Sequence, residues 1–303
     1  MPRKLIAIVG PTASGKTGLA MDISARTPGR TFEAVNADSR QVYRFMDIGT
    51  AKPTAEEQAR LPHHLIDIAD PDQPFSVGAW LDLARETLES IWHRGQIPLV
   101  VGGTGQYVWA LLEGWRVPRV PPQLELRKEL ENKPPEQLLA DLKRIDPEAH
   151  STIEPRNVRR VIRALEVYYA TGKPFSHWRL KDPPLFDWTA IGIRLERQGL
   201  YQRIDERVDA MMANGFLEEV RLLRERGCAR DLPSMSSIGY GEVTAHLVGE
   251  ITLEEAKART KLGSHRLARH QNAWFKSADD RIHWIEPGDS RQAVSLVEEF
   301  LVS

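Results

Sequence analysis

The sequence predicts an α/β fold built on a doubly wound parallel sheet with a helical insertion domain. Three observations support this prediction. Short apolar runs alternate with helical patterns, a glycine-rich phosphate loop joins the first run to the first helix, and the strand pattern is interrupted in the middle of the chain. Strand–helix alternation with short connections is typical of doubly wound sheets. With the phosphate loop, it predicts a P-loop NTPase-like fold.

Six short apolar runs are the predicted strands. Each is nearly continuous in apolar character, as expected of parallel strands that are covered on both faces. They are Lys4–Val9, Phe32–Ala37, His63–Ile68, Ile97–Gly103, Thr189–Leu195 and Arg281–Glu286. Helical patterns at Gly15–Arg26 and Val77–Arg94 separate the early runs, so we expect helices to connect these strands.

The middle of the chain lacks strand patterns. Its proline-separated helical patterns are Gln123–Leu130, Pro135–Ile145 and Asn157–Thr171. We therefore predict a helical insertion domain at residues 119–186, inside a core domain formed by residues 1–118 and 187–303. Within the latter segment, residues 199–278 are predicted to be helical apart from a turn at 231–240, and one last strand follows.

The composition limits the kinds of partner and the cellular compartment that can be expected for this protein. The 303 residues carry a net charge of -1, so there is no global basic field for nucleic acid and any such site must be a local patch. Cys228 is the single cysteine, which excludes a disulfide framework and fits a reducing compartment. The N-terminal apolar run is too short for a signal peptide and no run is long enough to span a membrane. These features predict a cytoplasmic protein without a membrane partner.

The phosphate loop is "GPTASGKT", which matches G-x-x-x-x-G-K-[ST] in full. It follows a predicted strand and opens a predicted helix, the context that confirms the motif. Its glycines let backbone N–H groups converge on phosphate oxygens at the positive end of a helix. Lys16 adds a charge, and Thr17 adds a hydroxyl for Mg²⁺. The predicted diphosphate- or nucleotide-binding residues are Gly10, Pro11, Thr12, Ala13, Ser14, Gly15, Lys16 and Thr17.

The loop by itself favours ATP as the ligand. However, P-loop ATPases usually carry an Asp that orders Mg²⁺ at the end of a second strand, and "LVVGGTG" ends in glycines instead. Asp38 and Asp67 are the remaining candidates, and no guanine-reading N-K-x-D is present. The loop therefore predicts a P-loop phosphotransferase of the metabolite-kinase type, and leaves other diphosphate chemistry open.

Two polar residues end predicted strands on the same edge as the loop. Asp38 follows the second strand, where a carboxylate is either a general base, a metal ligand or a helix N-cap. Thr104, in "GGTGQY", can either donate a hydroxyl into the site or cap the next helix. Open α/β sheets bind ligands at this edge, which favours the functional interpretation of Asp38. For Thr104, the two interpretations remain equally open.

Six motifs together resemble the tRNA dimethylallyltransferase family, whose enzymes prenylate an adenosine beside the anticodon. They are "GPTASGKT", "NADSRQVYRFMDIGTAKP", "PHHLIDI", "IPLVVGGTGQY", "RRVIRALEVYYATGKP" and "SIGYGE". Their order and spacing hold from Leu5 to Trp284. The resemblance implies transfer of a dimethylallyl group from dimethylallyl diphosphate to N6 of the adenosine at tRNA position 37, with release of diphosphate.

The resemblance also implies a role for each residue at the sheet edge. The loop with Lys16 binds the diphosphate of the donor instead of ATP, and Mg²⁺ is held at Thr17. Thr104 contacts the bridging oxygen, and Arg207 clamps the diphosphate with its guanidinium fork. Asp38 accepts the proton of the adenine amine.

The partners implied are dimethylallyl diphosphate and the anticodon stem-loop of tRNA, with no obligate protein partner and a monomer as the simplest state. The tRNA contacts implied by the resemblance are Asp38, Ser39, Arg40, Gln41, Arg127, Arg159, Arg160, Val161, Ile162, Arg163, Ser236, Ser237, Ile238, Gly239, Tyr240 and Gly241. Relatives commonly have basic or amide groups where this chain has Ser236 and a basic residue where it has Gly241. From the residues alone, an arginine run of this kind is more often a solvated helix face. Trp274 and Phe275 are predicted to be core residues.

Three other functions remain open at this point. An adenylate isopentenyltransferase would prenylate free AMP, ADP or ATP, but it needs neither the helical insertion nor the basic run. A metabolite kinase would leave "MDIGTAKP" without a role. A non-catalytic RNA-binding protein would not need Lys16, Thr17, Asp38 and Thr104 on one sheet edge.

Overall fold

The computed structural model describes residues 3–303, which divide into two compact units. The sheet unit comprises the described residues up to Phe75, together with Asp82–Val108 and Leu185–Ser303. The helical unit comprises Ser76–Leu81 and Trp109–Pro184. In the described residues, no helix is both long enough and apolar enough to cross a membrane.

Six parallel strands form a single sheet in the order β3-β2-β4-β1-β5-β6. Their bounds are β1 Lys4–Val9, β2 Phe32–Asn36, β3 His63–His64, β4 Ile97–Gly102, β5 Asp187–Ile193 and β6 Ile282–Ile285. All six predicted strands are confirmed, and so is the doubly wound parallel fold. β3 is shorter than predicted because Leu65 and Asp67 adopt positive φ angles of 61° and 56°, which an extended strand cannot contain.

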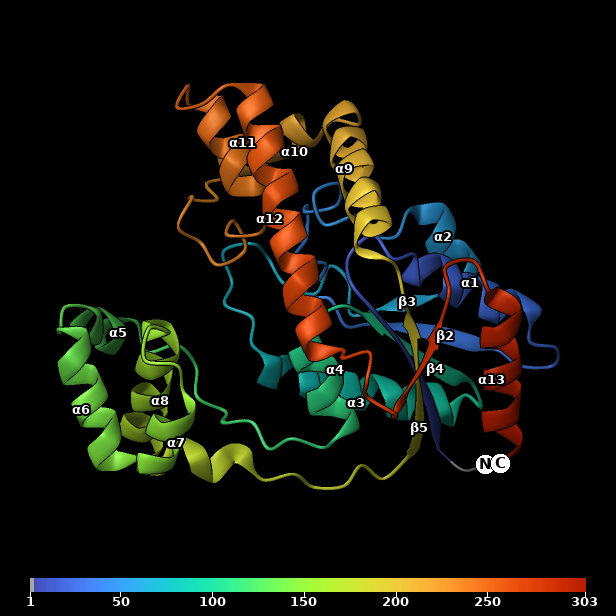
Figure 1. The fold of residues 1–303 in the computed structure, drawn as a ribbon, viewed down its shortest axis with the longest axis horizontal. Helices are drawn as coiled ribbons and strands as arrows, with labels where there is room; N and C mark the ends of the chain where they lie inside the picture. Colours follow the sequence, from blue (N-terminus) through green and yellow to red (C-terminus); the bar gives the residue numbers. More distant parts are fainter. Residues whose placement is uncertain (1–2) are drawn as a thin grey trace. The chain divides into compact units, whose positions relative to one another are not determined.

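The helices of the sheet unit either connect and cover these strands or lie beyond one edge of the sheet (Figure 1). Their bounds are α1 Lys16–Arg26, α2 Ala55–Arg60, α3 Val77–His93, α4 Gly105–Leu112, α9 Arg197–Ala213, α10 Phe216–Glu225, α11 Tyr240–Leu247, α12 Leu253–Trp274 and α13 Ser290–Val302. Residues 77–81 of α3 and 109–112 of α4 belong to the helical unit. The β1-to-β2 and β3-to-β4 connections run in opposite directions across the sheet. Right-handed crossovers therefore place α1 on one face and residues 82–93 of α3 on the other.

Helix α13 was not predicted, because the sequence analysis ended with the sixth strand. It packs with α1 on one face of the sheet, where Ala293 and Val297 join a buried cluster with Ile23 and Ile191. Its apolar residues recur at three- and four-residue spacing, the pattern of an amphipathic helix. The signal was therefore present in the sequence.

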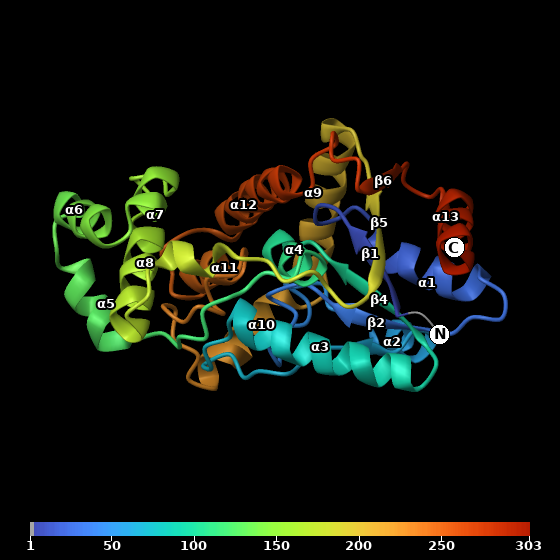
Figure 2. The same cartoon turned by 90° about the horizontal axis from the view of Figure 1, so that it is seen from below.

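The helical unit contains α5 Leu124–Glu131, α6 Pro135–Ile145, α7 Pro147–Thr152, α8 Val158–Thr171 and the 3₁₀ helix Phe175–Arg179, and α5–α8 pack together (Figure 2). This unit begins and ends earlier than the predicted 119–186. The two connecting segments pair with each other, since Asp182 N–H donates to the Gly114 carbonyl at 2.8 Å and Arg116 N–H donates to that of Leu180 at 2.9 Å.

The carboxyl ends of the strands place the predicted site residues at one edge. β1 leads into the phosphate loop, β2 into Asp38 and β4 into Thr104. Strand β1 lies between β4 and β5, next to the point where the direction of winding reverses, and this is where such sheets bind ligands. Helices α9 to α12 of the same unit rise beyond this edge (Figure 1).

Candidate active site

The phosphate loop is shaped by glycines with left-handed or otherwise unusual backbone angles. Gly10 has φ 147° and Gly15, the residue before α1, has φ 96°. An L side chain at either position would strain the backbone. The loop therefore turns sharply into α1 and presents the positive end of this helix to the cavity.

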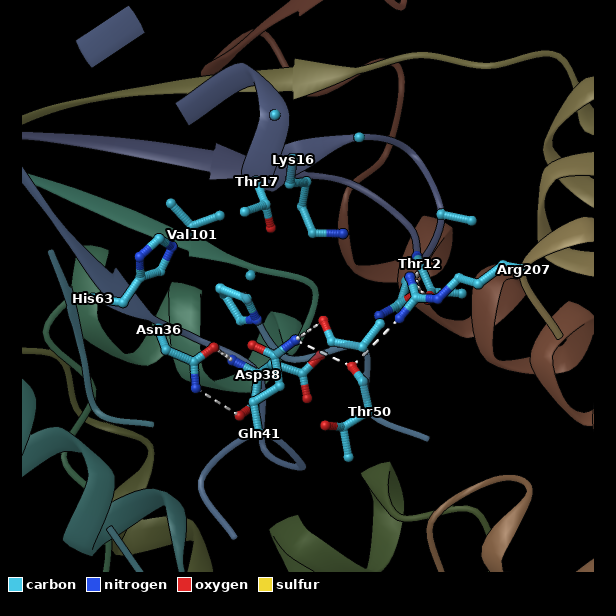
Figure 3. Close-up of a pocket in the computed structure, with 17 residues that line it drawn as sticks. Thr12, Lys16, Thr17, Asn36, Asp38, Gln41, Thr50, His63, Val101 and Arg207 are labelled. Atoms are coloured by element: carbon cyan, nitrogen blue, oxygen red, sulfur yellow. Dashed lines mark hydrogen bonds between the residues drawn. The ribbon is translucent and has the colours of Figure 1, made fainter. Parts of the chain in front are cut away.

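Eight predicted residues meet around one cavity of about 140 Å³ (Figure 3). Lys16 and Thr17 lie on one side of it, Asp38 and Gln41 on the opposite side, and Arg207 reaches it from α9. Thr12, Ala13 and Gly15 of the loop complete the predicted part of the lining, with Gly102 at the end of β4. The structure thus brings the loop, the carboxylate and the arginine together across three separate segments of the chain.

Asp38 is held rigidly by its own turn. Its N–H donates to Asn36 Oδ1 at 3.0 Å, and its Oδ1 accepts the N–H of Arg40 at 2.8 Å. Asn36 Nδ2 also donates to the Asp38 carbonyl at 3.1 Å. Within residues 3–303, Asp38 Oδ2 has no hydrogen-bond donor. One carboxylate oxygen therefore orients the group, and the other is left to accept a proton.

Two cations share the cavity with this carboxylate. Lys16 Nζ donates to the carbonyls of Gly10 at 3.1 Å and Pro11 at 2.7 Å. Burial lowers the pKa of Lys16 to about 8, against the opposing effect of Asp38, and the nearby Arg207 lowers it further. Burial also lowers the pKa of Arg207, while Asp38 raises it. A polyanion entering this cavity would meet two preplaced positive groups.

The lowered pKa of Lys16 predicts a pH dependence of anion binding. The ammonium is charged below about pH 8 in the free protein and loses its proton above that value. We expect kcat/KM for dimethylallyl diphosphate to fall as pH rises through about 8, since the neutral amine does not attract phosphate. A pH profile from 6.5 to about 9.5 measures this, with Lys16→Arg as the control, because arginine stays charged throughout that range. A profile of the parent protein that is flat through this range would contradict the prediction.

Thr104 fastens the end of β4 to the turn that carries Asp38. Its N–H donates to the Ala37 carbonyl at 3.1 Å, and its Oγ1 accepts the N–H of Ser39 at 3.0 Å. A Cβ on Gly102 would lie 2.2 Å from the Ala37 carbonyl oxygen, so only glycine permits this approach. Thr104 therefore stands at a fixed distance from Asp38.

Thr104→Val is expected to lower turnover by about 10-fold, because it removes one hydroxyl donor of ordinary strength from the site. Thr104→Ser keeps that hydroxyl and serves as the matched control. Single-turnover rates of both variants measure the effect. Equal losses in the two variants would assign Thr104 a packing role only.

A second cavity, of about 330 Å³, adjoins the first and shares Thr12, Asp38, Thr50, Arg207 and Gln271 with it. Apolar side chains from α9, α12 and the turn before α11 form one part of its wall: Ile204, Val208, Met211, Ile238, Leu267 and Trp274. Polar and charged residues, among them Arg40 and His270, line the rest. The prediction that Trp274 is a core residue is wrong, because 43% of it is exposed and its ring covers Gly105 at this cavity. Phe275 is buried, as predicted.

The "DIGTAK" loop is anchored by a residue that the sequence analysis missed. The Glu219 carboxylate accepts three consecutive N–H groups, from Asp47 at 2.8 Å, Ile48 at 2.6 Å and Gly49 at 3.1 Å. It also accepts the Tyr240 hydroxyl at 2.7 Å. These bonds hold the loop so that a carbonyl further along it faces the cavity.

That carbonyl belongs to Thr50, and two residues of the cavity donate to it. They are Arg207 Nη2, at 3.3 Å, and Gln41 Nε2, at 3.1 Å. Lys52, 4% exposed at its side chain, forms ion pairs with Asp47 at 2.5 Å and Asp67 at 2.6 Å. The "DIGTAK" loop therefore supports Arg207 through the Thr50 carbonyl.

The residues predicted to contact tRNA have two different surroundings in the sheet unit. Ser39, Arg40 and Gln41 line the cavities, and Arg40 Nη1 donates to the Pro233 carbonyl at 2.7 Å. Ser236 is exposed, and its hydroxyl lies 3.5 Å from Arg40 Nη2. The other residues of its run are less exposed: Ser237 and Tyr240 are buried, Gly239 has φ 94°, and Ile238 and Gly241 are half-buried. Of these, Ser237 and Ile238 also line the second cavity.

In the helical unit, the arginines predicted to contact tRNA differ in their surroundings. Arg159 and Arg160 are exposed on α8. By contrast, Arg127 and Arg163 both donate to Glu166, which is fully buried, at 2.7 Å and 2.5 Å. The side chains of Val161 and Ile162 pack in the core of this unit, so any tRNA contact by this run falls to its arginines.

Four further polar residues at the cavity were not predicted: Asn36, Thr50, His63 and Gln271. His63 Nδ1 lies 2.6 Å from the Leu61 carbonyl, and its buried Nε2 has no hydrogen-bond partner in the described part of the chain. Burial lowers the pKa of His63. His63 belongs to the motif "PHHLIDI", whereas Gln271 belongs to none of the six motifs, and only the fold brings the two residues to the cavity.

The residues at the cavity can hold a divalent cation only together with substrate phosphates and water. No group of three or more His, Cys, Asp and Glu side chains in residues 3–303 is arranged to hold a metal ion. Thr17 lines the cavity beside the loop. Mg²⁺ is commonly held by one or two protein oxygens together with substrate phosphates and water, and this set of residues fits that mode of binding.

Known proteins of one family are similar to this chain over most of its length. The sequence model of the IPP transferase family matches residues 41–278. The chain is 49% identical to a tRNA dimethylallyltransferase of Roseiflexus sp. (strain RS-1), with 98% of each chain covered. It is also similar to the crystal structure of a tRNA isopentenylpyrophosphate transferase from Bacillus halodurans, with 40% identity, a TM-score of 0.70 and coverage of 99% of this chain and 96% of the other.

A structure of a eukaryotic dimethylallyltransferase acting on tRNA is similar as well, with a TM-score of 0.84 and 27% identity over 99% of this chain and 80% of that one. The relative and the two solved structures cover 98–99% of this chain, whereas the family model covers residues 41–278, which follow the phosphate loop. The shared fold and the near-complete coverage leave one assignment: the chain belongs to the IPP transferase family of tRNA dimethylallyltransferases.

Proposed function

We propose that this chain transfers the dimethylallyl group of dimethylallyl diphosphate to N6 of the adenosine at tRNA position 37. The bond between the allylic carbon and the diphosphate oxygen breaks, a carbon–nitrogen bond forms, diphosphate leaves, and the amine loses one proton. The observation that carries the proposal is that Asp38 lines both a cationic phosphate site and an adjoining cavity with an apolar wall.

The diphosphate occupies the 140 Å³ cavity at the N-terminus of α1. The loop N–H groups and Lys16 bind its oxygens, and Arg207 closes the site from α9. An exocyclic adenine amine is a weak nucleophile, so the allylic carbon reacts only when the departing diphosphate is stabilised. Positive groups placed in advance do this without reorganising in the transition state. Thr104 donates its hydroxyl to the bridging oxygen, where negative charge develops.

Asp38 receives the proton of the amine. Its Oδ1 is held by the Arg40 N–H, which leaves Oδ2 to accept from the nucleophile. The apolar walls of the second cavity take the dimethylallyl chain and exclude water from the reactive carbon. Mg²⁺, held at Thr17 and by the diphosphate, would add further charge neutralisation to the leaving group.

The acceptor adenosine reaches Asp38 only if it leaves its stack, as bases of single-stranded loops do when proteins read them. We assign contacts with the anticodon stem-loop to Ser39, Arg40, Gln41 and Ser236 in the sheet unit, and to Arg159 and Arg160 in the helical unit. A tRNA substrate and a single reduced cysteine place this reaction in the cytoplasm.

The test is a transfer assay with radiolabelled dimethylallyl diphosphate. The purified protein is offered undermodified tRNA, AMP, or ATP with small metabolites. We expect label in tRNA and none in AMP. Label in AMP but not in tRNA would contradict the proposal, and consumption of ATP without transfer of label would assign a kinase activity instead. Omitting Mg²⁺ and adding a chelator tests the metal in the same assay.

A further inference from the structure

Helix α12 reaches the active site through two glycines that flank Thr104. A Cβ on Gly103 would lie 2.3 Å from Gln271 Nε2, and a Cβ on Gly105 would lie 2.3 Å from Trp274 Cγ. Gln271 and Trp274 are three residues apart, so they project from the same face of the helix. Two of the three glycines in the "GGTG" turn, Gly103 and Gly105, therefore admit side chains of α12, one on each side of Thr104 in the sequence.

Gln271 makes a second contact, with the phosphate loop. Its Oε1 accepts the N–H of Thr12 at 2.7 Å, and the residue is 7% exposed. N–H groups of such loops ordinarily point toward the bound anion. Here this one is bound by a side chain from the far end of the chain, which fixes the orientation of the Thr12 peptide.

The orientation of Thr12 bears directly on Arg207. The Thr12 hydroxyl lies 3.4 Å from Arg207 Nη1, so the residue that Gln271 holds is itself in contact with the guanidinium. Gln271 also lines both cavities, together with Thr12, Asp38 and Arg207. One amide thus links three parts of the site: the phosphate loop, the "GGTG" turn and the guanidinium.

We propose that Gln271 is a positioning residue for diphosphate departure: its Oε1 sets the Thr12 peptide, and with it Arg207, while its Nε2 end packs on Gly103 and so sets Thr104. Glutamine suits this place because it carries an acceptor without a charge. A glutamate would put a second carboxylate beside the diphosphate, and an asparagine is one methylene shorter. The proposal rests on the proposed prenyl transfer for its chemistry and on the contacts of Gln271 for its geometry.

The test compares Gln271→Met, which keeps the volume but has no acceptor for the Thr12 N–H, with the parent protein. The matched control is Asn272→Ala, an exposed amide on the same helix. We expect Gln271→Met to bind inorganic diphosphate about 10-fold more weakly and to lose about 10-fold or more in kcat, the scale of one lost buried hydrogen bond. The KM for tRNA and the melting temperature should stay near those of the control.

A conservative variant separates positioning from packing. Gln271→Glu retains the acceptor, so its kcat should be restored relative to Gln271→Met, while its KM for dimethylallyl diphosphate rises through charge repulsion. Equal kcat values for these two variants would overturn the proposal. So would a Gln271→Met protein whose diphosphate affinity and kcat match those of Asn272→Ala.

The contact with Gly103 provides a second, independent measurement. Gly103→Ala should displace Gln271 in the parent protein and have a smaller effect in Gln271→Ala, where the Gly10 carbonyl oxygen, 3.1 Å from the added Cβ, is the close contact that remains, so that the double-mutant cycle is non-additive. Additive effects would overturn the packing part of the proposal. Diphosphate affinity is measured without tRNA or a prenyl donor, so it tests the role of Gln271 even if the parent protein transfers no label. Absence of label transfer by the parent protein would contradict the proposed function instead.

Discussion

Asp38→Asn is expected to lower turnover by about 10²–10⁴-fold and to leave tRNA affinity within a few-fold, the effect of removing a general base. The amide preserves the shape of the side chain, and its oxygen can still accept the N–H of Arg40. It cannot accept the proton that the adenine amine must lose. Single-turnover prenyl transfer and tRNA binding, measured on the same preparation, separate the chemical step from recognition.

The control for this substitution is Asp209→Asn, which changes an exposed carboxylate on α9 that pairs with Lys261 outside both cavities. Its turnover should be that of the parent protein. Near-normal turnover of Asp38→Asn would remove Asp38 from the role of base. Loss of tRNA affinity as large as the loss of turnover would make it a recognition residue.

Lys16→Met should lower kcat/KM for dimethylallyl diphosphate by about 10²–10³-fold, the range for loss of one preorganised group that stabilises developing charge. The ammonium lies at the N-terminus of α1 beside Arg207, where both groups face the departing diphosphate. Methionine keeps the aliphatic length but has no charge. Initial rates at several donor concentrations give both kcat and KM.

The same substitution also removes the donor to the Gly10 and Pro11 carbonyls, so the melting temperature of Lys16→Met should be measured alongside its kinetics. Lys261→Met serves as the control, because Lys261 pairs with Asp209 away from the cavity. A folded Lys16→Met protein that retains the kcat/KM of this control would contradict the assignment of the loop as the diphosphate site.

The strands and the phosphate loop could be predicted because each is encoded by a local pattern. A run such as Lys4–Val9 is apolar on both faces wherever it lies in a parallel sheet. The glycines at 10 and 15 are required by backbone angles within the loop itself. Asp38 and Thr104 could be placed at one edge because parallel strands share a direction.

Errors arose where burial depends on distant partners. Trp274 has the composition of a core residue, but its surroundings are Gly105 and an open cavity. The ion pair of Arg127 with Glu166, which is 39 residues away, was likewise not predicted. Neither partner is visible in the periodicity around the residue, because periodicity reports which face of an element is apolar and not what covers it.

By itself, the sequence determined the six strands, the phosphate loop and the residue types at the carboxyl edge of the sheet, because φ preferences and apolar spacing act over a few neighbouring residues. Only the tertiary structure decided that Glu219 anchors the "DIGTAK" loop from 172 residues away and that Gln271 holds Thr12 from 259 residues away. Such contacts form when packed helices bring remote side chains within hydrogen-bonding distance, and no local pattern specifies that distance.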